Sequence, residues 1–332
     1  RLMGLDYSCG GHLTHGYKMN ISARMFESHP YGVDKETGLL DYDAIEKQAM
    51  EVKPLILLTG YSAYPRAINF KRFREIADKC GAVLMVDMAH FAGLVAGKVF
   101  TGDFDPVKWA DVVTTTTHKT LRGPRGAMIL CKKEFEDYVN KGCPMVLGGP
   151  LPHVMAAKAI AFKEANTKEY QDYAHQVVKN AQALAKELQD LGIRLQTNGT
   201  DNHLMLADIT SYGLTGKQAE AALFQAGVTT NANALPYDKN GAWYTSGLRV
   251  GTPALTTLGM KEGEMKEVAA IIDMVLKGTK PGVTKDGKPA KLKIVLDESV
   301  KEAASKRVQT LLSKFVLYPE LDLDFLKKEF VK

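Results

Sequence analysis

A lysine within a run of hydroxyl residues is the feature of this sequence that most clearly indicates chemistry. Lys119 lies in Thr114-Thr115-Thr116-Thr117-His118-Lys119-Thr120, after a strand-like run and before the glycine-rich Arg122-Gly123-Pro124-Arg125-Gly126. At a strand end its amine can be partly desolvated and form a Schiff base with a carbonyl, while nearby hydroxyls hold an anionic cofactor. A lysine without such surroundings is usually a surface residue, so the interpretation depends on its neighbours.

An aspartate ends another strand-like run earlier in the chain. Asp87 follows residues 82–86 and precedes Met88-Ala89-His90. At the carboxyl end of a parallel strand it would point into the crevice where open α/β sheets bind ligands. There it could pair with a protonated ring nitrogen of a cofactor, with His90 against an oxygen of the same ring. The alternative is an aspartate that caps a helix beside an exposed histidine.

The elements that must position these residues alternate between strands and helices. The sequence predicts strands at 55–58, 82–86, 112–116 and 127–130. Residues 69–80 carry Phe70, Phe73, Ile76 and Ala77 at helical spacing and end at Gly81, a good C-terminal capping residue. This alternation predicts an α/β fold, with a mostly parallel sheet in a large cofactor-binding domain over residues 1–160.

The second half of the chain predicts a smaller α+β domain over residues 161–332. Residues 153–191 read as one or two long helices. After Gly192, strands are expected at 204–207 and 248–250, and helices at 217–226 and 262–276. Residues 277–291 contain Gly, Pro and five lysines without apolar periodicity and predict an exposed linker. Residues 297–315 predict a terminal amphipathic helix.

The composition excludes several other classes of protein. Of the 332 residues, 45% are hydrophobic and 24% charged, the composition of an ordinary soluble globular chain. The net charge of +5 is scattered, so no nucleic-acid partner is expected, and no stretch reaches the ~18 apolar residues of a membrane span. The four cysteines lie far apart without metal-ligand spacing, which predicts reduced thiols, no metal site and a cytoplasmic protein.

Together these segments resemble the fold-type I pyridoxal-phosphate enzymes, and the serine hydroxymethyltransferase family above all. The motifs that carry the resemblance keep the family's order over roughly residues 1–275. They are Gly10-Gly11-His12-Leu13-Thr14-His15-Gly16, Val86-Asp87-Met88-Ala89-His90, the threonine run through Lys119, Gly148-Gly149-Pro150, Thr200-Asp201-Asn202-His203-Leu204 and residues 246–253. The resemblance also implies that the family's N-terminal part is absent from this sequence.

The resemblance implies a role for each matching residue. Lys119 would bond the cofactor, Asp87 would pair with its pyridinium nitrogen, and His12 would stack on its ring opposite Ala89. The remaining cofactor-binding residues implied are His90, Ser62, His118 and, toward the phosphate of a neighbouring subunit, Gly148 and Gly149. Arg249 would clamp the substrate carboxylate, as a planar bidentate donor can. The other substrate-binding residues implied are Arg125, Asn233, which would contact the pterin of folate, and Leu13.

The activity implied is the reversible conversion of serine and tetrahydrofolate to glycine and 5,10-methylenetetrahydrofolate, in a homodimer or a dimer of dimers. Two alternatives remain. Another fold-type I enzyme acting on amino acids, such as a threonine aldolase or a racemase, would use the same lysine, aspartate and arginine. A chain without the family's N-terminal part could also be an inactive fragment.

Overall fold

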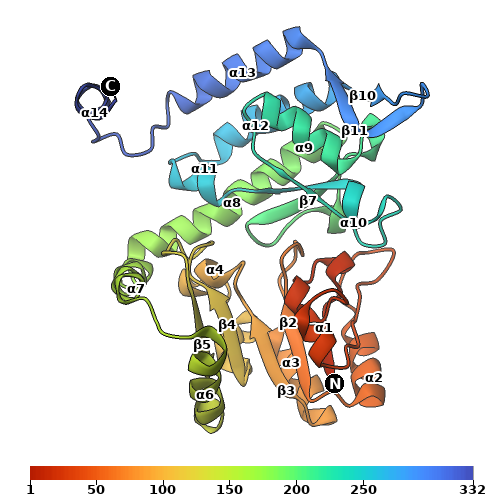
Figure 1. Ribbon diagram of the computed structural model, residues 1–332, viewed down its shortest axis with the longest axis vertical. Coiled ribbons are helices and arrows are strands. Elements are labelled where there is room, and N and C mark those ends of the chain that lie inside the picture. Colours follow the sequence, from red (N-terminus) through yellow and green to blue (C-terminus); the bar gives the residue numbers. More distant parts are fainter. Residues whose placement is uncertain (332) are drawn as a thin grey trace.

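The computed structural model describes residues 1–331, which form two parts, each around its own sheet (Figure 1). The first part holds a five-stranded sheet in the order β1-β2-β3-β4-β5. Its strands are β1 (Leu2–Gly4), β2 (Ile56–Gly60), β3 (Val83–Asp87), β4 (Val112–Thr116) and β5 (Ala127–Cys131). Strands β1 to β4 are parallel and β5 pairs antiparallel with β4, so the predicted mostly parallel sheet is confirmed.

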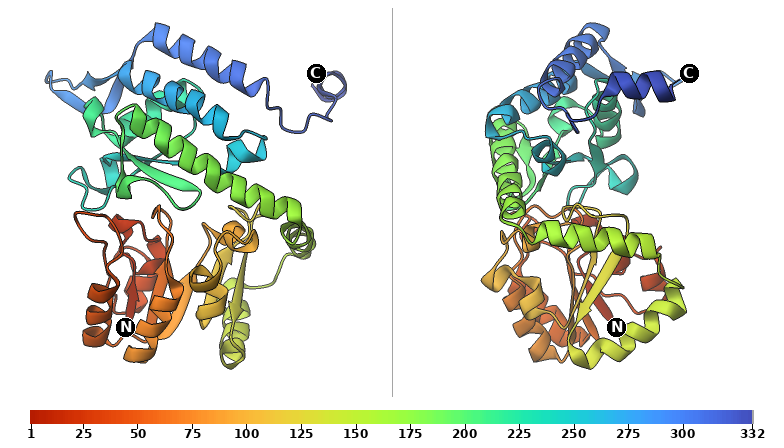
Figure 2. Two further views of the ribbon diagram at one scale, coloured as in Figure 1. Left: turned by 180° about the vertical axis from the view of Figure 1, so that it is seen from behind. Right: turned by 90° about the vertical axis from the view of Figure 1, so that its left-hand side faces the viewer.

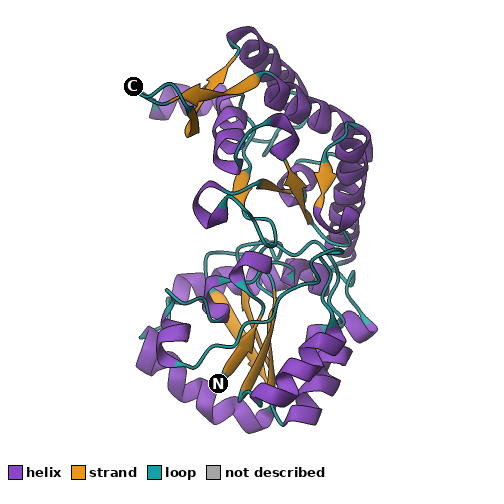
Figure 3. Cartoon of the chain, turned by 90° about the vertical axis from the view of Figure 1, so that its right-hand side faces the viewer, coloured by secondary structure: helices purple, strands orange, loops and turns teal. Residues whose placement is uncertain are grey.

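Helices pack around this sheet, as Figure 3 shows with the strands at the centre of the lower part. They are α1 (Ile21–Met25), α2 (Tyr42–Val52), α3 (Phe70–Cys80), α4 (Ala92–Ala96), α5 (Pro106–Trp109) and α6 (Glu136–Leu147). Helix α3 matches its prediction. Asn69 caps it by accepting the N–H of Arg72 at 2.9 Å, and Gly81 ends it with a φ of 75°. Its four predicted apolar residues are all buried in the core.

The second part is built on an antiparallel sheet in the order β6-β7-β9-β8. Its strands are β6 (Arg194–Leu195), β7 (Leu204–Asp208), β8 (Asn231–Asn233) and β9 (Gly247–Gly251). The helices of the second half are α7 (Pro152–Ala165), α8 (Lys168–Asp190), α9 (Gly216–Gln225), α10 (Gly241–Tyr244), α11 (Pro253–Thr257), α12 (Glu262–Lys277), α13 (Glu298–Leu312) and α14 (Leu323–Phe330). The strands predicted at 204–207 and 248–250 and both predicted helices between 217 and 276 are confirmed.

The stretch predicted as one or two helices forms two, α7 and α8, because Thr167 caps a new helix by accepting the N–H of Tyr170 at 3.2 Å. Helix α8 runs from the first part of the molecule into the second (Figure 2). Its early residues Tyr170, Ala174 and Val177 pack in the core of the first sheet. Its later residues, from Ala181 to Leu188, pack in the core of the second. A single helix therefore joins both cores.

The prediction of an exposed linker at 277–291 is wrong. Strand β10 (Thr279–Val283) pairs antiparallel with β11 (Pro289–Leu296) as a two-stranded sheet. The pairing is supported from α9, where Gln218 Nε2 donates to the carbonyls of Ala290 at 2.7 Å and Lys293 at 2.9 Å. A prediction based on apolar periodicity misses this hairpin because its strands are rich in lysine and contain glycine. The supporting side chain, Gln218, also lies far away in the sequence.

Candidate active site

The residues expected to do chemistry gather at the carboxyl edge of the parallel sheet. Ser62 follows β2, Asp87 ends β3 and Lys119 follows β4. Because these strands are neighbours and parallel, their carboxyl ends meet at one edge, where such sheets bind ligands. A cavity of about 490 Å³ opens there, and we call it the Lys119 cavity. Its lining includes His12, Ser62, Asp87, Ala89, His90, Thr114–Thr116, Lys119 and Leu147.

Hydrogen bonds within the loop after β4 position Lys119. The hydroxyl of Thr117 donates to the carbonyl of Pro124 at 2.7 Å, and the N–H of Arg122 donates to the carbonyl of Lys119 at 2.9 Å. Burial lowers the pKa of the Lys119 amine, and the charges of Arg249 and Arg125 lower it further against the opposing charge of Asp87. The lysine is therefore neutral, and nucleophilic, at a lower pH than an ordinary lysine.

The carboxylate of Asp87 is kept ionised although it is mostly buried. Burial raises its pKa, but the hydrogen bond from His15 and the N–H of Ala89, at 3.0 Å, outweigh burial and hold the pKa below its usual value. His15 Nε2 lies 3.3 Å from Asp87 Oδ2. Sequence reasoning assigned no role to His15, although the residue stands in the quoted glycine-histidine motif. The spacing of three residues between His12 and His15 could have indicated it, because this spacing places both histidines on one short 3-10 helix, with His12 as its N-cap.

His12 lies on the wall of the Lys119 cavity, as Ala89 does. It caps the 3-10 helix Leu13–His15, with its Nδ1 2.8 Å from the hydroxyl of Thr14. Burial lowers the pKa of His12, and the charge of Lys119 lowers it further against the opposing charge of Asp87. The imidazole therefore presents an uncharged ring to the cavity.

His90 also lines the Lys119 cavity, and its ring stacks on that of His203, with centroids 5.8 Å apart and planes inclined by 19°. Burial, followed by the charge of Lys119, depresses the pKa of His90 far below its usual value. His203 was not predicted as a site residue. It stands in a quoted motif, but its position beside His90 depends on the packing of two distant segments.

Arg249 comes to the site from the second sheet. Its Nη1 donates to the carbonyl of Ser62 at 2.8 Å, and burial lowers the pKa of the guanidinium. It lines a second cavity, of about 250 Å³, which we call the Arg249 cavity. The other lining residues include Tyr7, Gly10, Gly11, His12, Leu13, Ser62 and Asn233. The two cavities share His12 and Ser62, so Arg249, Leu13 and Asn233 lie beside the Lys119 cavity.

Four predicted site residues line neither of these two cavities. Arg125 Nη1 lies 3.4 Å from His118 Nε2, so these two residues contact each other beside the Lys119 loop. Gly148 and Gly149 are exposed at the end of α6, and a Cβ built on either would meet no atom within 4 Å. Only Leu147, which precedes them, reaches the Lys119 cavity.

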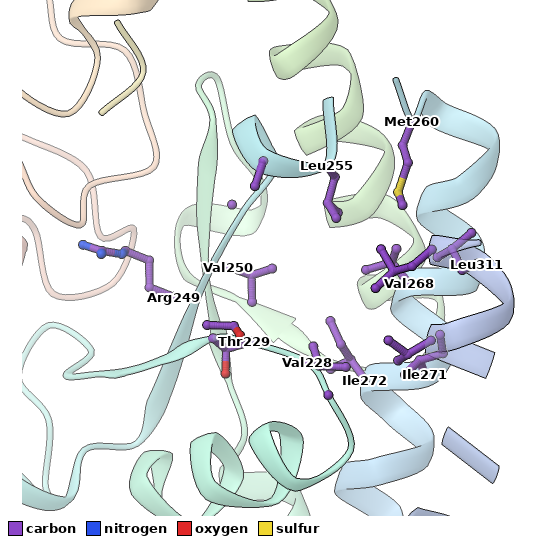
Figure 4. Close-up of a pocket in the computed structure, with 16 residues that line it drawn as sticks. Val228, Thr229, Arg249, Val250, Leu255, Met260, Val268, Ile271, Ile272 and Leu311 are labelled. Atoms are coloured by element: carbon purple, nitrogen blue, oxygen red, sulfur yellow. The ribbon is translucent and has the colours of Figure 1, made fainter. Parts of the chain in front are cut away.

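Strand β9 separates the site from a third, apolar cavity (Figure 4). Its lining includes Val228, Val250, Leu255, Met260, Val268, Ile271, Ile272 and Leu311. The side chain of Arg249 points to the opposite side of the strand, toward the site. Within residues 1–331, no group of three or more histidine, cysteine or acidic side chains could hold a metal ion. The described helices include none that is both long and apolar enough to cross a membrane.

A mostly parallel sheet with a lysine and an aspartate at its carboxyl edge, faced by an arginine from a smaller sheet, defines the class of fold-type I pyridoxal-phosphate enzymes. The family model described as serine hydroxymethyltransferase matches residues 1–272. The chain belongs to the serine hydroxymethyltransferase family.

Proteins named serine hydroxymethyltransferase are similar over nearly the whole chain. That of Treponema pallidum is 62% identical over 332 residues, which are 100% of this chain and 58% of that protein. That of Salinispora tropica is 59% identical over 97% of this chain and 68% of its own length. That of Chlamydia muridarum is 52% identical over 98% of this chain and 66% of its own. The chain thus spans between 58% and 68% of the length of these relatives.

Proposed function

We propose that this chain carries the catalytic lysine and the substrate arginine of a serine hydroxymethyltransferase. The reaction is the reversible conversion of serine and tetrahydrofolate to glycine and 5,10-methylenetetrahydrofolate. The observation that carries the proposal is the pair of adjoining cavities, one with Lys119 and Asp87 and the other with Arg249, which share His12 and Ser62. Family membership and the names of the relatives agree with it.

The groups around the Lys119 cavity fit pyridoxal phosphate. The cavity offers an amine of lowered pKa for the aldehyde and, in Asp87, an ionised carboxylate for the ring nitrogen. The uncharged ring of His12 would stack on one face of the cofactor ring, and the methyl group of Ala89 would pack against the other, since both residues line this cavity. When bound, the cofactor withdraws electrons from the α-carbon of the amino acid. Lys119 and Asp87 would hold it, with His90 and Ser62 beside it.

The groups around the Arg249 cavity fit an amino acid and a flat, partly polar second substrate. Among residues 1–331, no carboxylate forms a salt bridge with Arg249, and one of its terminal nitrogens donates a hydrogen bond to the Ser62 carbonyl. Its remaining donors can therefore bind the carboxylate of serine. Leu13 and Asn233 line the same cavity and offer an apolar surface and an amide to the pterin of tetrahydrofolate. Arg125 would support substrate binding from beside Lys119.

We also propose that the working unit is a cytoplasmic homodimer or dimer of dimers. Met145, Val146 and Leu147 form an apolar run with exposures of 84%, 80% and 75%, directly before Gly148 and Gly149. An exposed apolar segment of this kind is typical of a surface that another chain covers. Gly148 and Gly149 would then bind the cofactor phosphate of the partner through their N–H groups, with His118 on the cofactor side of its own chain. We further propose that the chain divides into a large cofactor-binding domain, residues 1–160, and a smaller C-terminal domain, residues 161–332.

The proposal is tested by measuring glycine formation from serine with and without tetrahydrofolate, after addition of pyridoxal phosphate. Serine turnover that requires tetrahydrofolate supports it. Turnover of threonine or racemisation of an amino acid without tetrahydrofolate would instead favour the aldolase or racemase alternative. If no cofactor binds at Lys119, the result would favour the alternative that the chain is an inactive fragment.

A further inference from the structure

We infer that His203 is a positioning residue for His90, which it holds through the stack of their two rings. The inference deepens the proposed function and rests on it for the role of His90. The two histidines are far apart in the sequence and come from different sheets. His90 follows β3, at the edge of the parallel sheet, and His203 precedes β7 of the antiparallel sheet. Their rings are nearly parallel, and both are buried or nearly so.

The surroundings of His203 fix its position from both parts of the molecule. Its carbonyl accepts the N–H of Thr252 at 3.1 Å, at the end of the strand that carries Arg249. The preceding residue, Asn202, donates through Nδ2 to the hydroxyl of Tyr61 and to the carbonyl of Tyr64, both at 3.0 Å. Tyr61 directly precedes Ser62 in the loop after β2. The carbonyl of His203 is therefore bonded to the end of the Arg249 strand, and the side chain of its neighbour Asn202 is bonded to the loop after β2.

The His203 ring contacts the site through its stack on the ring of His90. Nδ1 of His203 is buried without a hydrogen-bond partner among residues 1–331. A buried polar atom without a partner destabilises a fold, so hydrogen bonding to the protein does not explain the histidine. Burial, with the charges of Arg249 and Lys119, lowers the pKa of His203 to about 3. At neutral pH two uncharged rings therefore face each other, and no charge repulsion opposes the stack.

Two replacements separate the stack from simple filling of space. His203→Leu fills most of the volume without an aromatic face, and His203→Phe restores a flat ring. His175→Leu is the matched control, because His175 is an exposed histidine of α8. The first measurement is the NMR signal of the His90 ring in the chain without cofactor, assigned with a His90→Asn variant. We expect His203→Leu to shift this signal, and His203→Phe and His175→Leu to leave it near its original position.

The second measurement is the visible circular dichroism of added pyridoxal phosphate, together with serine turnover. His203→Leu should change the dichroism and reduce kcat by about tenfold to a hundredfold, with little change in the KM for serine. His203→Phe should restore both. The inference is overturned if His203→Leu leaves the His90 signal and the dichroism unchanged, or if His203→Phe disturbs them as strongly as His203→Leu. If the unmodified chain shows no transfer of a one-carbon unit from serine to tetrahydrofolate, the proposed function is contradicted. The effect of His203 on the His90 signal is measured without cofactor and does not depend on that outcome.

Discussion

The imidazole of His15 donates a hydrogen bond to the carboxylate of Asp87, with Nε2 3.3 Å from Oδ2. The direction of this bond follows from the other side of the ring. Nδ1 accepts the backbone N–H of His12 at 3.2 Å, so it carries no proton, and the proton must be on Nε2. The side chain of His15 is only 1% exposed, which protects the bond from water. The Asp87 carboxylate at the cavity is therefore held in a fixed orientation, with Oδ2 bonded to His15 and Oδ1 bonded to the N–H of Ala89.

The first prediction concerns the ionisation of Asp87. His15→Phe should raise the pKa of the Asp87 carboxyl, because burial remains and the hydrogen bond that offsets it is lost. The carboxyl signal of Asp87 in a pH titration by NMR measures this directly. His175→Phe, at an exposed position, should leave the titration unchanged. A pKa of Asp87 that does not rise in His15→Phe would show that other groups keep it ionised.

The same pKa gives a prediction for stability. The pKa of Asp87 is lower in the folded than in the unfolded chain. At a pH between these two pKa values, the folded state therefore binds fewer protons at Asp87 than the unfolded state does. The contribution of Asp87 to stability is therefore complete above the unfolded pKa and is lost as the pH falls through the folded pKa. Urea unfolding should become less dependent on pH in the acid range in Asp87→Asn. An unchanged slope in that variant would contradict the direction of the shift.

Lys119 should form the covalent bond with added pyridoxal phosphate. Borohydride reduction and peptide mapping should place the pyridoxyl group on Lys119, and Lys119→Arg should remove it. Because the pKa of Lys119 is lowered, labelling should begin at a lower pH than for an exposed lysine. Lys158→Arg is the control, since Lys158 lies close by and donates to the carbonyl of Ala127 at 2.7 Å. Label on any other lysine in the unmodified chain would overturn the assignment.

Arg249 should bind the substrate carboxylate. Arg249→Ala should weaken serine binding by about 2–5 kcal/mol, because the carboxylate loses a charged partner in a half-buried place. Arg249→Lys should also weaken it, since an ammonium cannot form the same bidentate pair. Absorbance of the bound cofactor should survive both changes. Arg194→Ala is the control, because Arg194 is an exposed arginine of the same sheet and pairs with Asp208. Equal serine affinity in titrations of Arg249→Ala and the unmodified chain would place the carboxylate elsewhere.

Gln218 should stabilise the strand pair β10–β11. Its amide donates to two carbonyls of β11, so Gln218→Ala removes the donor to the buried carbonyl of Ala290 and should cost about 1–3 kcal/mol of unfolding free energy. Gln225→Ala, at an exposed position of the same helix, should have a much smaller effect. Urea unfolding of both variants measures the difference. Equal stabilities would mean that the strand pair does not depend on α9.

The sequence was sufficient for elements whose pattern is local. Helix α3 was predicted because its cap, its apolar face and its final glycine all lie within it. Asp87 and Lys119 were found because both follow strand-like runs, and parallel strands bring their ends together. His15 and His203 were missed because their partners, Asp87 and His90, lie far away in the sequence and only the folded chain brings them into contact. The hairpin β10–β11 was missed because its strands lack an apolar pattern, although they are neighbours in the sequence.

Helix α8 has a mechanical consequence for the site. Its 23 residues span about 34 Å at the usual rise for each residue, and it is continuous through both cores. A continuous helix is stiff along its axis, so it acts as a strut that keeps the two cores at a constant spacing along that direction. Lys119 belongs to the first part of the molecule and Arg249 to the second. The helix therefore helps to set the separation between the lysine and the arginine of the site.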